Sequence, residues 1–263
     1  ELAGLTLKEA YEKQPTLFTE KKYDKFPLLI KILDASDNLS VQVHPEDDYA
    51  RENENGELGK TECWYVLDAK AGAKLVYGHT AKTKEEFTDK INHEQWQELF
   101  IEEEVKAGDF FYIPAGTLHA IGEGILIYEV QQNSDTTYRV YDYDRIDKDG
   151  NKRELHIEKT KDVTKVPFEK VTTSPKTEKL EGATVTHLAD EKYFSVFKVE
   201  VEGQVSLEKT QTGNLFTVLK GSGNVEIEGS IYDVKKGDSF ILTTDCSNYT
   251  LKGNMFLVGS YDR

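Results

Sequence analysis

Two side chains that can bind a metal ion stand two positions apart in a stretch rich in valine. Gln42 and His44 alternate there with Val41 and Val43. Because the side chains of a β-strand alternate between its two faces, Gln42 and His44 point to one face and the valines to the other. An amide oxygen and an imidazole nitrogen on the same face could bind a metal ion. A half-buried strand with a hydrogen-bonded polar face shows the same pattern, so the pair alone leaves both interpretations open.

The composition restricts the partners of the chain. Its 263 residues carry a formal net charge of −15, which disfavours nucleic acid and anionic membranes but leaves room for an anionic small molecule in a local basic pocket. No stretch approaches the roughly 20 consecutive apolar residues that a transmembrane helix needs, and no signal peptide is recognisable. We therefore expect a soluble chain that binds neither nucleic acid nor a membrane.

The cysteines indicate a cellular compartment. Cys63 and Cys246 lie far apart in the sequence, and unpaired thiols are typical of a reducing environment, so we expect a cytoplasmic protein. The chain begins at Glu1 without an initiator methionine, which suggests a fragment or a processed form. We expect a monomer or a weak homodimer.

The apolar pattern predicts many short strands and few helices. Strands are expected at residues 27–35, 39–44, 62–67, 74–77, 110–114 and 125–130, and helical segments at 1–25 and 82–100. Residues 45–61 and 131–170 are polar and are expected to be irregular, and residues 166–180 look like a linker. Lys31 lies inside the first apolar run, where its ammonium group must reach the surface or pair with another group.

The second half of the chain repeats the first. The nine residues that start at Val105 align with the nine that start at Val234, and both segments contain a Gly-Asp turn. Trp64 to Leu67 aligns with Phe216 to Leu219 in the same way. Short strands joined by such turns and repeated twice predict a mainly β fold, with two antiparallel jelly-roll barrels and a few peripheral helices.

The two copies differ at their polar positions. In the aligned sequences Glu62 corresponds to Asn214 and His119 to Asn248, while Gln42 and His44 fall near Phe197 and Val199. A scaffold requirement would be expected in both copies, whereas a site would be needed in only one. We therefore assign a metal-binding catalytic barrel with helical additions to residues 1–165. Residues 166–263 are expected to form a degenerate second barrel without a metal site.

The segment around His119 has the order of a known superfamily. Gly108 and Asp109 form a turn, a strand follows, and Pro114 and Gly116 form a second turn just before His119. This order resembles the cupin superfamily, which implies a barrel but no particular chemistry.

Four separated motifs give a more specific resemblance. They are Ser40–Pro45, Lys60–Glu62, Pro114–His119 and Glu129–Arg139. In this order they resemble the type I phosphomannose isomerases, most closely their short bacterial branch, and the resemblance covers nearly the whole chain. It implies a metal-dependent aldose-ketose isomerase that interconverts mannose 6-phosphate and fructose 6-phosphate through an enediol, by moving a proton between C2 and C1.

The resemblance also implies the metal ligands. Gln42, His44, Glu62 and His119 match the zinc-binding positions of the family, with one ion per chain. Independently of the family, two ring nitrogens, a carboxylate and an amide oxygen suit zinc while leaving positions open for water or substrate. Iron, manganese and cobalt remain alternatives.

The remaining matches concern catalysis. The resemblance implies catalytic roles for Lys60, Glu129, Asp135 and Arg139, and substrate contacts by Lys31, Lys60 and Arg139. The family motif Lys-Pro-Glu here reads Lys60, Thr61, Glu62. A lysine beside a divalent cation should have a lowered pKa and could transfer protons. Without a metal site, Arg139 would more simply form a surface ion pair with Asp135.

Two other functions compete with the isomerase. An iron-dependent cupin oxygenase would need a redox-active site that is usually richer in histidine, and the Gln42 ligand and the Lys60–Glu62 spacing disfavour it. A non-catalytic sugar-binding cupin protein would need no Lys60, Glu129 or Arg139 beside the four ligands. Both alternatives are therefore ranked below the isomerase.

Overall fold

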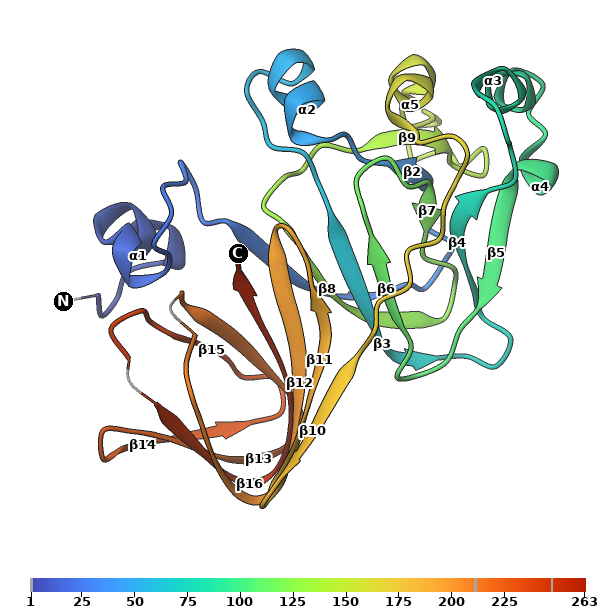
Figure 1. Cartoon of the computed structure of the whole chain (residues 1–263). Coiled ribbons are helices and arrows are strands. Elements are labelled where there is room, and N and C mark those ends of the chain that lie inside the picture. The colour runs from blue at the N-terminus through green and yellow to red at the C-terminus, as the bar shows by residue number, and fades with distance from the viewer. Residues whose placement is uncertain (1, 211, 247) are drawn as a thin grey trace. The chain divides into compact units, whose positions relative to one another are not determined.

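The computed structural model describes residues 2–210, 212–246 and 248–263, and its fold is mainly β (Figure 1). It consists of two compact units. The central unit comprises residues 29–172, and the terminal unit comprises residues up to 28 together with 173–263. Among the described helices, none is long and apolar enough to cross a membrane.

The central unit contains two sheets. The four-stranded sheet has the order β1-β8-β3-β6, and the five-stranded sheet has the order β5-β4-β7-β2-β9. The strands of the first sheet are β1 (Leu28–Asp34), β8 (Ile125–Gln132), β3 (Glu62–Ala69) and β6 (Phe110–Ile113). Those of the second are β5 (Phe100–Glu104), β4 (Lys74–His79), β7 (His119–Ala120), β2 (Val41–Val43) and β9 (Tyr138–Tyr141). One apolar core contains buried side chains from both sheets, among them Trp64 and Ile127 of the first and Leu75 and Tyr77 of the second.

A second core lies on the other face of the five-stranded sheet. Val41 and Val43 pack there with Phe87 and Leu99 of the helices. The helices of this unit are α2 (Asp47–Asn53), α3 (Lys84–Asn92), α4 (Trp96–Leu99) and α5 (Ile157–Val163). Because Val41 and Val43 face the helices, strand alternation turns the intervening Gln42 toward the four-stranded sheet.

The terminal unit is built around one bent sheet of long strands. Its order is β10-β11-β12-β16-β13-β14, and β15 also pairs with β13. The strands are β10 (Lys176–Leu180), β11 (Ala183–Asp190), β12 (Phe194–Leu207), β13 (Asn214–Ile227), β14 (Ser230–Lys235), β15 (Ser239–Leu242) and β16 (Tyr249–Asp262). The core of this unit includes Val199, Phe216, Val218 and Leu257.

The Gly-Asp turn has the same hydrogen bonds in both units. In the central unit Val66 N–H donates to Asp109 O over 2.9 Å, and Gly108 N–H donates to Val66 O over 2.8 Å. Gly108 has a φ of 96°, in the left-handed region that favours glycine. The corresponding bonds of the terminal unit, both 2.9 Å long, join Val218, Asp238 and Gly237. The repeat seen in the sequence is therefore a structural repeat at this turn.

The N-terminal residues belong to a different unit from the one expected. The sequence predicts them as part of a 1–165 unit, but residues up to 28 group with 173–263. The reason is apolar contact. Helix α1 (Leu7–Lys13) and the 3-10 turn η1 (Pro15–Leu17) lead to a small core of Ala10, Tyr11 and Phe18, against which Ile241 packs.

Three local predictions differ from the structure. Residues 45–61 contain α2, which buries only Ala50 and so leaves no apolar stripe to detect. The segment 131–170 contains β9 and α5. Phe197 and Val199 lie opposite Gly259 and Leu257 in β16, which pairs with β13 as β8 pairs with β3. These two residues therefore occupy the place of β1, not that of β2.

Candidate metal and active site

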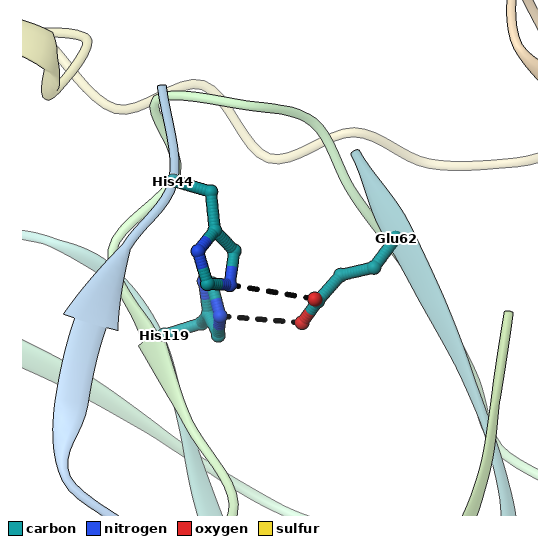
Figure 2. Close-up of side chains that lie close together, drawn as sticks. All are labelled: His44, Glu62 and His119. Atoms are coloured by element: carbon teal, nitrogen blue, oxygen red, sulfur yellow. Dashed lines mark ion pairs between the residues drawn. The ribbon is translucent and has the colours of Figure 1, made fainter. Parts of the chain in front are cut away.

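Three buried side chains from three segments of the central unit point at one another (Figure 2). His44 follows β2, Glu62 begins β3 and His119 begins β7. His44 Nε2 lies 3.4 Å from Glu62 Oε2, and His119 Nε2 lies 3.2 Å from Glu62 Oε1. All three residues are at most 1% exposed. Within the described residues they form the one group of three or more His, Cys, Asp or Glu side chains close enough to share an ion.

Backbone carbonyl groups fix the orientation of both imidazoles. His44 Nδ1 lies 2.9 Å from Thr136 O, and His119 Nδ1 lies 2.8 Å from Thr117 O. Because a carbonyl oxygen only accepts, each Nδ1 carries the proton and donates it. Each Nε2 is therefore left with its lone pair directed at Glu62, which is the tautomer that metal-binding histidines use.

The electrostatics of the cluster fit a cation. Burial, assisted by the positive charge of Lys60, lowers the pKa of His44 to about 3, so its ring is neutral. Burial alone would raise the pKa of Glu62, but the positive charge of Lys60 is the main cause that holds it well below its usual value. In the described structure both Nε2 atoms and both Glu62 oxygens are buried without a hydrogen bond. Buried polar atoms are rarely left so, and a shared metal ion would satisfy all four.

Gln42 lies beside this cluster. It pairs with His119 across β2 and β7 and with Arg139 across β2 and β9. Directly opposed residues of an antiparallel pair share a face, so the side chains of Gln42, His119 and Arg139 form one row on the five-stranded sheet. Gln42 is thus on the predicted face and next to His119.

Lys60 is buried against the cluster. Its Nζ lies 3.2 Å from Glu62 Oε2. Burial alone would lower the pKa of Lys60, but Glu62 and Glu129 outweigh it and raise this pKa above its ordinary value. The protein groups by themselves therefore act opposite to the lowering predicted from a neighbouring cation, and they keep the lysine charged.

Thr61 explains how a chain without the motif's proline holds this segment. Its N–H donates to Gln132 Oε1 over 2.8 Å, and its hydroxyl accepts from Ala115 N–H over 3.2 Å. A proline could make neither bond. Thr61 therefore ties Lys60 and Glu62 both to the end of β8 and to the turn that precedes His119.

Glu129 is held at both carboxylate oxygens. Trp64 Nε1 donates to its Oε1 over 3.1 Å, and Lys31 Nζ lies 3.1 Å from its Oε2. Burial and the charge of Glu62 raise the pKa of Glu129, although Lys60 and Lys31 act against this rise. The structure thus brings three of the predicted residues, Lys31, Lys60 and Glu129, into the neighbourhood of Glu62.

Arg139 and Asp135 differ in their surroundings. Arg139 lies in β9 beside Gln42, and its Nε is buried without a hydrogen bond among the described residues. No ion pair in the described part of the chain joins it to Asp135, so the surface-pair interpretation has no support. Asp135 is exposed, and its charge is felt by Lys60.

Comparison with known proteins places the chain in a family. The model of the type I phosphomannose isomerase catalytic domain matches residues 1–67, and that of the mannose-6-phosphate isomerase cupin domain matches residues 184–262. Mannose-6-phosphate isomerase ManA of Bacillus subtilis is 48% identical over 250 residues, which are 95% of this chain and 79% of ManA. The chain belongs to the type I phosphomannose isomerase family. The Streptococcus mutans mannose-6-phosphate isomerase is 46% identical over 98% of this chain and 81% of its own.

Solved structures agree with this membership. The crystal structure of a Bacillus subtilis mannose 6-phosphate isomerase superimposes with a TM-score of 0.93 at 43% identity, covering 97% of this chain and 82% of that one. A mutant of the Salmonella typhimurium phosphomannose isomerase superimposes with a TM-score of 0.79 at 16% identity, covering 98% of this chain and 85% of that one. The latter likeness concerns the fold alone.

Some polar contacts of this phosphomannose isomerase family member were not expected from its sequence. Trp64 stands in an apolar stretch of the sequence, yet its indole N–H donates to Glu129. Gln131 is fully buried, and its Oε1 accepts from Lys31 Nζ over 2.5 Å. The strand period contains a signal for both contacts, because Trp64 follows Glu62 by two positions and Gln131 follows Glu129 by two.

A cavity elsewhere lacks such groups. It has a volume of about 770 Å³ in the terminal unit, between β14 and β15, and its walls include Val234, Phe240 and Leu242. Among the described residues no histidine lines it, and no group of possible metal ligands like His44, Glu62 and His119 lies there. Donor chemistry rather than volume therefore identifies the candidate site.

Proposed function

We propose that this chain interconverts mannose 6-phosphate and fructose 6-phosphate with one zinc ion per chain. The observation that carries the proposal is the buried cluster of His44, Glu62 and His119 beside Lys60, in a chain 48% identical to an enzyme named mannose-6-phosphate isomerase. His44, Glu62 and His119 would hold the ion with Gln42 as a fourth ligand, and the bound ion would act as a Lewis acid toward the sugar oxygens.

Glu129 is proposed to move the proton. The isomerisation removes a proton from C2 of the aldose and returns it to C1, so the transferring group must both accept and release it. A carboxyl group with a raised pKa is suited to both steps near neutral pH. Trp64 donates a hydrogen bond to one of its oxygens and Lys31 pairs with the other, which limits the directions in which the carboxyl group can act.

The cationic side chains are proposed to bind and stabilise charge. Arg139 would stabilise the negative charge that develops on the enediolate, because its guanidinium is permanently charged and its Nε has no hydrogen bond in the described structure. Lys60, kept charged, would donate to a sugar oxygen. The ammonium of Lys31 has three N–H groups, of which the hydrogen bond to Gln131 uses one, so a further N–H group is proposed to bind the substrate. Asp135 would orient Lys60 through its charge.

A coupled isomerase assay on mannose 6-phosphate tests the proposal. We expect turnover by the metal-loaded chain, loss of turnover after chelation, and recovery on adding zinc. Parallel additions of iron, manganese and cobalt identify the preferred ion. An inactive metal-loaded chain, or activity that survives complete metal removal, would contradict the proposal.

The remaining expectations are tested separately. We propose a cytoplasmic enzyme whose partner is a small sugar phosphate and which acts as a monomer or a weak homodimer. Light scattering across a concentration series distinguishes these two states. No specific contact in the described residues favours the iron-dependent oxygenase or the non-catalytic sugar-binding protein. Oxygen uptake by the iron-loaded chain would be evidence for the oxygenase.

A further inference from the structure

The residue that connects the metal cluster with the proton-transferring carboxyl is Trp64. It lies in β3, is 1% exposed, and follows Glu62 by two positions on the same face of the strand. Its single donor, the indole N–H, is 3.1 Å from Glu129 Oε1. Its ring also meets the ring of His119 edge-on, with 5.4 Å between centroids and an interplanar angle of 76°. One side chain therefore contacts both a metal ligand and Glu129.

The repeated fold shows what packing alone requires at this place. Phe216 stands two positions before Val218, as Trp64 stands two positions before Val66, and the two valines make matching turn bonds. Phe216 is 1% exposed, so an aromatic ring without a donor fills this position in the terminal unit. The need for a buried ring is thus common to both units, whereas the N–H is not.

The strand opposite explains where the donor is needed. Trp64 faces Glu129 across β3 and β8, while Phe216 faces Gly259 across β13 and β16. Opposite the carboxyl group of Glu129, the ring is an indole with an N–H donor. Opposite Gly259, the ring is a phenyl group without a donor. The indole nitrogen is therefore matched to Glu129 and not to the core.

The other oxygen of Glu129 lies beside a lysine that is itself hydrogen-bonded. Lys31 Nζ pairs with Glu129 Oε2 and also donates to Gln131 Oε1. The amide nitrogen of Gln131 donates to the backbone carbonyls of Gln132 and Ser134, over 2.8 and 2.9 Å. In the described structure Glu129 Oε2 has this ion pair but no hydrogen bond, so the directional contact on the carboxyl group is the indole N–H on Oε1.

We propose that Trp64 is a positioning residue, whose N–H sets the plane of the Glu129 carboxyl for proton transfer to and from the substrate. The proposal rests on the proposed function, in which Glu129 moves the proton. Without the N–H, the carboxyl keeps only Lys31 and can rotate about its last side-chain bond. Misplacing a reacting group by about 1 Å costs on the order of a hundredfold in rate.

Trp64→Phe tests the proposal in the metal-loaded chain, because phenylalanine keeps the ring that the terminal unit uses. We expect kcat to fall roughly 10- to 100-fold with KM within about threefold of wild type, since a positioned group acts on the chemical step. Metal content is expected to remain one ion per chain. The matched control is Tyr77→Phe, which removes a buried hydroxyl of the same core that donates to Tyr112 O over 2.6 Å. The control should keep kcat within about twofold of wild type.

A second measurement does not depend on activity or on the folding of Trp64→Phe. The chain has two tryptophans, and Trp96→Phe leaves the Trp64 indole N–H as a single ¹⁵N-correlated NMR signal. In that background Glu129→Gln should move the signal upfield, because an amide oxygen accepts a weaker hydrogen bond than a carboxylate.

The outcomes separate the two proposals. Full activity of Trp64→Phe, or an indole signal that ignores Glu129→Gln, overturns the positioning role while leaving the isomerase intact. Loss of the metal from Trp64→Phe also overturns it, because the indole would then act through His119. A wild-type chain without turnover on mannose 6-phosphate overturns the proposed function and the positioning role with it.

Discussion

In the central unit Glu62 and Trp64 lie on one face of β3, and the equivalent face of β13 in the terminal unit carries Asn214 and Phe216. Glu62 is directed at two imidazoles, whereas the amide oxygen of Asn214 accepts a hydrogen bond from the Thr210 hydroxyl. Both pairs of residues are buried, and both strands form the same hydrogen bonds to a Gly-Asp turn. The difference teaches that the turn and the apolar positions specify the scaffold, and that a few polar substitutions on it create a site.

The largest expected effect comes from making the central unit resemble its twin. Glu62→Gln replaces the shared carboxylate by an amide, as Asn214 does in the terminal unit. We expect metal to fall far below one ion per chain and turnover to fall more than about a hundredfold, because the ligand set loses its charge. Elemental analysis and the coupled assay measure this. Retention of a full metal ion would show that Glu62 is not a ligand.

Arg139→Ala should separate catalysis from metal binding within the central unit. We expect the metal to remain and kcat to fall by about 10²- to 10³-fold, since a stabilising charge is lost only in the transition state. Arg153→Ala is the control, because Arg153 pairs with Asp142 and is half exposed. A near-normal rate for Arg139→Ala would remove this residue from the catalytic set.

The reverse substitution should destabilise the terminal unit without creating a metal site in it. Asn214→Glu places a carboxylate at a position that is 1% exposed, and we expect no second metal ion and a loss of about 1–3 kcal/mol in unfolding free energy at pH 7. Burial raises the folded-state pKa of such a carboxyl above its unfolded value, so the loss should shrink as pH falls toward that unfolded value. Urea unfolding at pH 5 and pH 8 measures this difference. Binding of a second ion would contradict this expectation and would show that a single carboxylate suffices to create a metal site in the terminal unit.

The smallest effect concerns what the units share. Gly108→Ala and Gly237→Ala each place a side chain at a φ near +95°, and in neither case would the new Cβ meet an atom within 4 Å. We expect each change to cost about 1 kcal/mol of unfolding free energy through backbone strain alone. Chemical denaturation of both variants tests whether the two turns are equivalent. A difference much larger than that cost would show that one turn has an additional role.

The sequence predicted which residues share a strand face better than it predicted how these faces meet in the folded chain. The period of a strand places Gln42 with His44 and Lys60 with Glu62, and the motif order indicates that these pairs act together. The convergence of Glu62 and His119 could not follow from periodicity, because it depends on how two sheets pack. The ion pair between Lys31 and Glu129 joins residues 98 positions apart and had no local signal.

Other features escaped prediction for identifiable reasons. Helix α2 buries only Ala50, so its residues read as a polar loop. The sequence pattern placed the N-terminal residues with the central unit, because the contact of Phe18 and Tyr11 with Ile241 of the terminal unit is long-range and has no local signal. A buried tryptophan in an apolar strand is most simply interpreted as a core residue. The hydrogen bond from its indole N–H becomes evident only when Glu129 is seen opposite it in the neighbouring strand.

The orientation of His44 and His119 depends on peptide oxygens, those of Thr136 and Thr117. A side-chain substitution leaves the main-chain oxygen in place. Alanine substitution of those two threonines is therefore expected to leave both imidazole rings in the same orientation. Replacing the amide bond that follows Thr117 or Thr136 by an ester weakens the accepting carbonyl itself and so tests its role directly. In a cluster held in this way the course of the main chain orients the two rings, and the side chains at positions 117 and 136 are not needed for it.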